Sequence, residues 1–170
     1  MVLGKSVDVA NMQEGQETKR VPLSVTPLPG AFSILSYCLM PNHFHLAVRQ
    51  ETDIPIGKLI LKVCTSYSMY FNRKYAHVGH VFQDQFKAVP ITSDEQLLWL
   101  SFYIHNNPKK DGLVKRAQDW PYSSYGEYVG KGDLCETDVI LGRYTSPARY
   151  HEEFSESEKE KGAPFNFELL

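Results

Sequence analysis

Two histidines separated by one residue are the first side chains in the chain that could do chemistry. His43 and His45 lie in an apolar, β-rich run, residues 43–49, which predicts a strand. Side chains alternate between the two faces of a strand, so both imidazoles are expected to project from the same face. That geometry allows two histidines to bind one metal ion. The ordinary alternative is a pair of polar residues on the solvent face of a hairpin.

A tyrosine and an asparagine four positions apart form the second signal. Tyr103 and Asn107 lie on a predicted helix, where this spacing places them on one face, one turn apart. Taken alone, Tyr103 would be read as a half-buried aromatic, and Asn107, which precedes Pro108, as a helix-ending residue.

The two signals together indicate a site that cleaves phosphodiesters. Two neutral imidazoles and one amide oxygen leave a metal ion with several positions for phosphate oxygens and water, so the ion can act as a Lewis acid. The phenol of a tyrosine has an ordinary pKa of about 10 and needs a nearby cation to attack as the phenolate. We therefore predict Tyr103 as nucleophile and His43, His45 and Asn107 as metal ligands.

The elements that must position these residues follow from hydrophobic periodicity and turn signals. In chain order we expect strands at 32–39 and 43–49 joined by a turn, a helix at 56–75, a strand at 81–91, and a helix that begins at Ser93 and ends at Pro108. This order predicts an α+β fold: a ferredoxin-like antiparallel sheet with helices packed on one face.

The prediction divides the chain into three parts. Residues 1–30 are expected to be a poorly structured or atypical lead-in, because three prolines interrupt any helix or central strand there. The sheet therefore lacks an evident first strand and helix. Residues 31–130 form the predicted catalytic domain. Residues 131–170 are expected to be an acidic, partly mobile C-terminal extension.

Bulk composition excludes several classes of protein. At 170 residues and 42% hydrophobic, the chain suffices for one domain with a core, and no apolar run is long enough to cross a membrane. Three cysteines, with no C-x-x-C pair, favour a reducing cytoplasm over a disulfide framework or cysteine zinc site. Because the net charge is −2, any contact with nucleic acid must come from a local basic surface.

Four segments resemble, in order, the motifs of one known family. Residues 36–46 (SYCLMPNHFHL) resemble the "MPNHxHL" signature of the HUH single-tyrosine transposases. Residues 70–83, 103–114 and 119–125 resemble their "YFNRRY…GHLFQ", "YIHxNPVxAGLV" and "DWxWSSY" stretches, and the match is closest to the REP-associated tyrosine transposases. The front of the chain lacks their "YHVxxRG" run, and Lys109-Lys110-Asp111 replaces their Val-x-Ala.

The resemblance implies a metal-dependent enzyme that nicks and rejoins single-stranded DNA containing hairpins. His43 and His45 would hold magnesium or manganese, and Asn107 would complete the site. Tyr103 would attack phosphate to give a 5′-phosphotyrosine and a free 3′-hydroxyl. No organic cofactor is implied, and a homodimer, in which Tyr103 serves either chain, is left open.

Basic residues are expected to contact DNA phosphates in this reading. They are Arg73, Lys74, Lys87, Lys109 and Lys110. The main alternative uses the same surface without catalysis: a hairpin-binding protein derived from a domesticated or truncated transposase. A third reading, a small metal-binding protein that uses His77, His80 or His105, explains none of the motif order.

Overall fold

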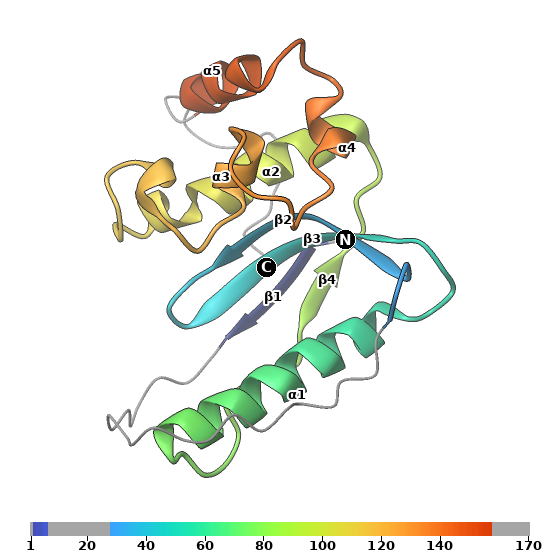
Figure 1. The fold of residues 1–170 in the computed structure, drawn as a ribbon, viewed down its shortest axis with the longest axis vertical. Helices are drawn as coiled ribbons and strands as arrows, with labels where there is room; N and C mark the ends of the chain where they lie inside the picture. The colour runs from blue at the N-terminus through green and yellow to red at the C-terminus, as the bar shows by residue number, and fades with distance from the viewer. Residues whose placement is uncertain (1, 7–27, 158–170) are drawn as a thin grey trace.

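A four-stranded antiparallel sheet lies at the centre of the computed structural model, which describes residues 2–6 and 28–157 (Figure 1). The strands are β1 (Val2–Ser6), β2 (Phe32–Leu39), β3 (His43–Gln50) and β4 (Lys87–Val89), in the order β2-β3-β1-β4. The helices are α1 (Ile56–Tyr75), α2 (Asp94–Lys110), α3 (Tyr125–Tyr128), α4 (Asp138–Leu141) and α5 (Pro147–Ser157), with a 3-10 turn η1 (Ala117–Asp119). The α+β class and the ferredoxin-like antiparallel sheet are confirmed. None of the described helices is both long and apolar enough to span a membrane.

The first strand of the sheet is present, which corrects the expectation that it is lacking. β1 lies between β3 and β4, and Val2 pairs with Ala47 on one side and Val89 on the other. Its five residues include Gly4 and Lys5, so local strand propensity is weak, and pairing with two neighbours outweighs it. The remainder of the predicted lead-in, residues 7–27, lies outside the described residues.

Helices cover both faces of the sheet, whereas the sequence predicted helices on one face. Phe44 and Leu46 of β3 pack with Ile60 on α1, while Ala47, which points the other way, packs with Leu100 on α2. Strand alternation divides β3 between two cores, because each face carries its own apolar side chains. Figure 1 shows α1 on one side of the sheet and α2 to α5 on the other.

The predicted strand at 81–91 is much shorter in the structure. Only Lys87–Val89 forms β4, because its partner β1 pairs with it over Val2 to Gly4 alone. Phe82 and Phe86 lie in a loop and pack against the core between the sheet and α1, which contains Phe44, Leu46 and Ile60.

The last turn of α2 continues past the proline that was expected to end it. The hydroxyl of Ser93 accepts the predicted N-terminal capping bond, but the helix extends through Pro108 to Lys110. Proline removes one backbone bond, and the end of the helix is closed by a Schellman-type pattern. There, Leu113 donates to the Pro108 carbonyl (2.9 Å) and Gly112 adopts φ 73°, a conformation that favours glycine.

The C-terminal segment contributes to a second hydrophobic core and is not a separate extension in the part described. This core joins α2 and α3 to α4 and α5, and its buried members are Phe102, Ala117, Tyr125, Tyr128, Ile140, Tyr150 and Phe154. Three of them lie beyond residue 130, so the predicted boundary at 130/131 cuts through the core. Residues 158–170 lie outside the described residues.

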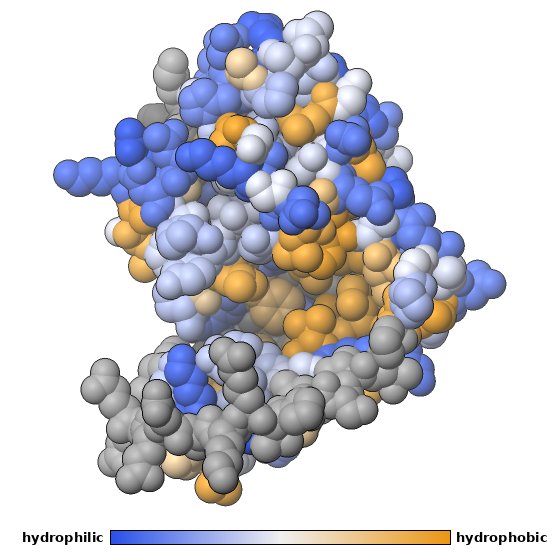
Figure 2. Space-filling view, in the orientation of Figure 1, coloured by the Kyte–Doolittle hydropathy of each residue, from blue (hydrophilic) through white to orange (hydrophobic). Residues whose placement is uncertain are grey.

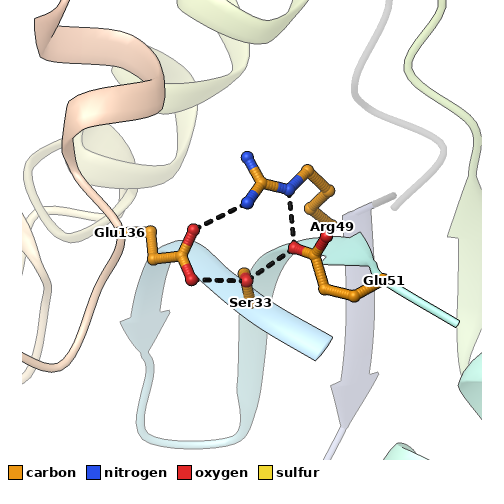
Figure 3. Close-up of polar contacts among 4 residues, drawn as sticks. All are labelled: Ser33, Arg49, Glu51 and Glu136. Carbon is orange, nitrogen blue, oxygen red and sulfur yellow. Dashed lines mark hydrogen bonds and ion pairs between the residues drawn. The ribbon is translucent and has the colours of Figure 1, made fainter. Parts of the chain in front are cut away.

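A polar cluster also ties the C-terminal segment to the sheet (Figure 3). Arg49 on β3 donates to Glu51 (2.6 Å) and to Glu136 (2.7 Å), and the hydroxyl of Ser33 on β2 lies 2.6 Å from a carboxylate oxygen of each glutamate. The backbone of Glu136 donates to the carbonyl of Ile34 (2.8 Å). Arg49 is thus held in a structural contact at the end of the hairpin remote from His43.

Residues 122–124 run along the outer edge of β2. Leu39 donates its backbone N–H to Tyr122 (2.8 Å), Ser124 donates to Tyr37 (2.9 Å), and Cys38 and Ser123 form an isolated antiparallel bridge. These bonds occupy backbone groups of β2 that β3 does not use.

Candidate functional site

The predicted histidine pair converges at one point on the α2 face of the sheet. His43 and His45 have their Nε2 atoms 3.1 Å apart, and the rings meet at 89° with centroids 4.8 Å apart. His45 is buried, at 2% exposure, and His43 is half-buried. The shared face expected from strand alternation is what the structure has.

Asn42, which lies in the turn between β2 and β3, orients the first histidine. The Asn42 side-chain oxygen lies 2.8 Å from Nδ1 of His43. A carbonyl oxygen can only accept, so Nδ1 carries the proton and Nε2 keeps a free lone pair. The signal available in the sequence was an amide side chain immediately before the first histidine.

Burial keeps both imidazoles neutral. The pKa of His45 is lowered to about 4, chiefly by desolvation, and electrostatic repulsion from His43 and Lys110 acts in the same direction. Desolvation also lowers the pKa of His43, although the carboxylate of Asp111 opposes that shift. At neutral pH both imidazoles are therefore unprotonated at one ring nitrogen, and that nitrogen can bind a metal ion.

α2 brings Tyr103 against the histidines. The ring of half-buried Tyr103 meets that of His45 edge-on, at 81° with centroids 5.6 Å apart. α2 packs on β2 and β3, which sets this contact. Asn107 lies one turn further on, at 5% exposure, and its amide nitrogen donates to the Tyr103 carbonyl (2.8 Å). The structure thus brings Tyr103 into contact with His45, and the Asn107 amide is held by the helix backbone.

The donor set fits a weakly bound divalent ion. Two ligands at about 2.1 Å in adjacent octahedral positions are about 3.0 Å apart, close to the 3.1 Å between the two Nε2 atoms. For His45 to bind through Nε2, its proton must lie on Nδ1, which is buried and unpaired among the described residues. Within that part of the chain, no group of three or more His, Cys, Asp or Glu side chains could hold a metal.

Of the predicted DNA-binding residues in the described part of the chain, Lys110 approaches a site residue, namely Tyr103. Lys110, at the end of α2, places Nζ 5.6 Å from the centroid of the Tyr103 ring, and Lys109 precedes it. Lys87 begins β4. Arg73 and Lys74 lie in the last turn of α1, on the other face of the sheet, and are not brought to the histidines.

The remaining histidines do not support the reading as a metal-binding protein. His105 is fully buried, and its ring nitrogens contact the hydroxyls of Tyr150 (2.9 Å) and Ser124 (2.8 Å). His77 contacts Asn72 through Nδ1 (2.8 Å). His105 therefore joins α2 to α5 and to the segment beside β2, which is a structural role.

Burial of His105 predicts a loss of stability in acid. Desolvation lowers its pKa from 6.5 to about 3. As the pH falls below 6.5, His105 becomes protonated in the unfolded chain but stays neutral in the folded chain. The free energy of unfolding therefore declines until the pH reaches the folded pKa. We expect a loss on the order of 2 kcal/mol at pH 5, measured by urea unfolding.

His105→Gln should reduce this pH dependence, and His80→Ala, a change at an exposed histidine, should preserve it. If the free energy of unfolding declined equally with pH in wild type and both variants, the explanation would be contradicted.

The part of the chain that contains this site is similar to one known family of proteins. Residues 28–107, which contain the two histidines, Tyr103 and Asn107, match the family described as "Transposase IS200 like". This region is slightly less than half of the chain, and over it the chain is similar to the IS200-like transposases. A Haemophilus influenzae protein named as a REP-associated tyrosine transposase is 31% identical to this chain over 118 residues, covering 63% of the chain and 66% of that relative.

A solved structure has a similar fold over part of this chain. It is a REP-associated tyrosine transposase bound to a REP hairpin, with a TM-score of 0.53 and 24% identity. The likeness covers 63% of this chain and 62% of that one. Both relatives are thus matched over slightly less than two thirds of their length.

Proposed function

We propose that this chain is an IS200-like transposase that nicks and rejoins single-stranded DNA through a 5′-phosphotyrosine on Tyr103, in the presence of magnesium or manganese. The observation that carries the proposal is the edge-on contact between Tyr103 and His45, whose Nε2 converges with that of His43. A phosphate located between them would face the phenol on one side and the two imidazole nitrogens on the other.

The reaction is a transesterification that balances without an external energy source. The Tyr103 oxygen forms a bond to phosphorus while the bond from phosphorus to the 3′-oxygen breaks. The phenol gives up its proton, and the leaving oxygen takes one up to become a 3′-hydroxyl. Because one phosphodiester replaces another, a 3′-hydroxyl can attack the phosphotyrosine and rejoin the strand.

His43 and His45 would hold the ion, with the amide of Asn107 completing the site. When bound, the ion supplies Lewis-acid polarisation of the scissile phosphate. The chain's own contribution is orientation: Asn42 fixes the His43 ring, β3 aligns the two nitrogens, and α2 holds the phenol against His45. Modest affinity is expected, because the ligands are two imidazoles and an amide without thiolate or carboxylate.

Single-stranded DNA with a hairpin is the proposed substrate. The solved relative with the same fold is described as bound to a REP hairpin. With a net charge of −2, the chain must attract DNA through local cations. Lys109 and Lys110 lie in the last turn of α2, and Lys110 reaches the Tyr103 ring.

The test is covalent capture. The chain is incubated with a 5′- and 3′-labelled hairpin oligonucleotide and manganese, then denatured. We expect an adduct that resists denaturant, carries the 5′-phosphate side of the cut, and yields a linked peptide containing Tyr103.

Tyr103→Phe is the matched control. It keeps the ring and its packing, so hairpin affinity should change by less than about 1 kcal/mol, while the adduct disappears. A wild-type chain that binds the hairpin yet forms no adduct with any divalent metal would instead indicate the non-catalytic hairpin-binding protein.

A further inference from the structure

The sheet register aligns a lysine with the buried histidine. Gly4 of β1 pairs with His45 on β3 and with Lys87 on β4, so these residues form one row across three strands. Directly paired residues of antiparallel strands direct their side chains to the same face. Lys87 therefore shares the face of His45, and the residue between them is a glycine, which has no side chain to separate them.

This part of the face is accessible. Lys87 is exposed, and α2 packs on β2 and β3, away from the strand that carries Lys87. Two strand spacings put the Lys87 and His45 backbones about 10 Å apart, which equals the Debye length at about 0.1 M salt and slightly exceeds the value of about 8 Å at physiological salt. The opposite face at Lys87 is apolar, because the preceding Phe86 packs toward α1.

A second lysine approaches the site from α2. Tyr103, Asn107 and Lys110 follow one another at helical spacings of four and three, so they share one face. Helical side chains lean toward the N-terminus of their helix, and Lys110 accordingly reaches back to place Nζ 5.6 Å from the Tyr103 ring centroid.

We propose that Lys110 and Lys87 form a phosphate track across this face: Lys110 holds the phosphate that Tyr103 attacks, and Lys87 holds the next phosphate of the same strand. The track rests on the proposed function for the identity of the attacked phosphate. It fixes a direction for the strand, from the end of α2 across His45 and Gly4 to β4.

A simpler role for Lys110 would be to offset the negative end of the α2 dipole. That role gives the lysine no preference for one DNA phosphate. The two lysines are therefore tested against single phosphates of the substrate.

The experiment measures hairpin affinity in metal-free buffer, where no cleavage occurs. The hairpins carry one uncharged methylphosphonate linkage, at the scissile position or at either neighbouring position. The proteins are wild type, Lys87→Met, Lys110→Met and, as control, Lys58→Met on the α1 side of the sheet.

Replacing a lysine should weaken hairpin binding only when the phosphate that this lysine contacts is still charged. With native DNA, Lys87→Met and Lys110→Met should each bind about tenfold more weakly. Lys110→Met should lose nothing further when the scissile linkage is neutral, and Lys87→Met nothing further when one neighbouring linkage is neutral. The crossed combinations should be additive, and Lys58→Met should resemble wild type.

Other outcomes separate the two proposals. Additive losses for every lysine and linkage would overturn the track, whether or not wild type forms the Tyr103 adduct. If the losses couple to two adjacent linkages in a protein that forms no adduct, the two lysines form a phosphate track, but the nicking function and the assignment of the Lys110 phosphate as the attacked one are both overturned. A wild-type chain with no measurable hairpin affinity would overturn both.

Discussion

The double change His43→Ala and His45→Ala is expected to lower metal-dependent adduct formation by at least about 100-fold. Both imidazoles are neutral and converge within 3.1 Å, so together they provide most of the proposed ligand set. Manganese binding, measured by electron paramagnetic resonance, should fall in parallel. The fold should persist, as circular dichroism can show, because the apolar residues of β3 on either side are unchanged.

His80→Ala is the control for a histidine outside the site, since His80 is exposed. It should retain both manganese binding and the adduct. Tight zinc binding that survives the double change, or an adduct that forms at the wild-type rate without the two histidines, would contradict the metal assignment.

Phe154→Ala is expected to destabilise the chain by about 3–4 kcal/mol. The Phe154 side chain is buried in the second core, where it meets Phe102 of α2 at a centroid distance of 5.7 Å and Tyr125 of α3 at 4.9 Å. Removing the ring leaves a cavity between three helices. Urea unfolding of both proteins measures the difference.

Glu156→Ala, an exposed change on the same helix, should alter stability by less than about 0.5 kcal/mol. A Phe154 variant as stable as this control would show that α5 adds little to the core, and would restore a domain boundary near residue 130.

The hairpin and the two long helices could be predicted because their signals are local. Strand alternation gave β2 and β3, and the cap at Ser93 gave the start of α2. β1 could not be predicted, because its strand character depends on pairing with β3 and β4. Pro108 was misjudged for a related reason, since the bonds that close α2 come from residues beyond it.

The site divides in the same way. His43 with His45, and Tyr103 with Asn107, follow from spacing within one strand and one helix. Their contact requires α2 to pack on β3, which no local pattern shows. The alignment of Lys87 with His45 could not be predicted from the sequence either, because it depends on the register of β1 with both β3 and β4.

The bonds along the outer edge of β2 limit how two copies of the chain could associate. An uncovered edge strand can recruit a strand from another molecule and extend the sheet. Residues 122–124 already bond to Tyr37 and Leu39, so β2 is closed to such an addition there. β4 forms the other edge, but it is three residues long and begins with Lys87, and both features discourage strand addition. A dimer formed through the described residues would therefore have to use helix or loop surfaces in place of a continuous intermolecular sheet.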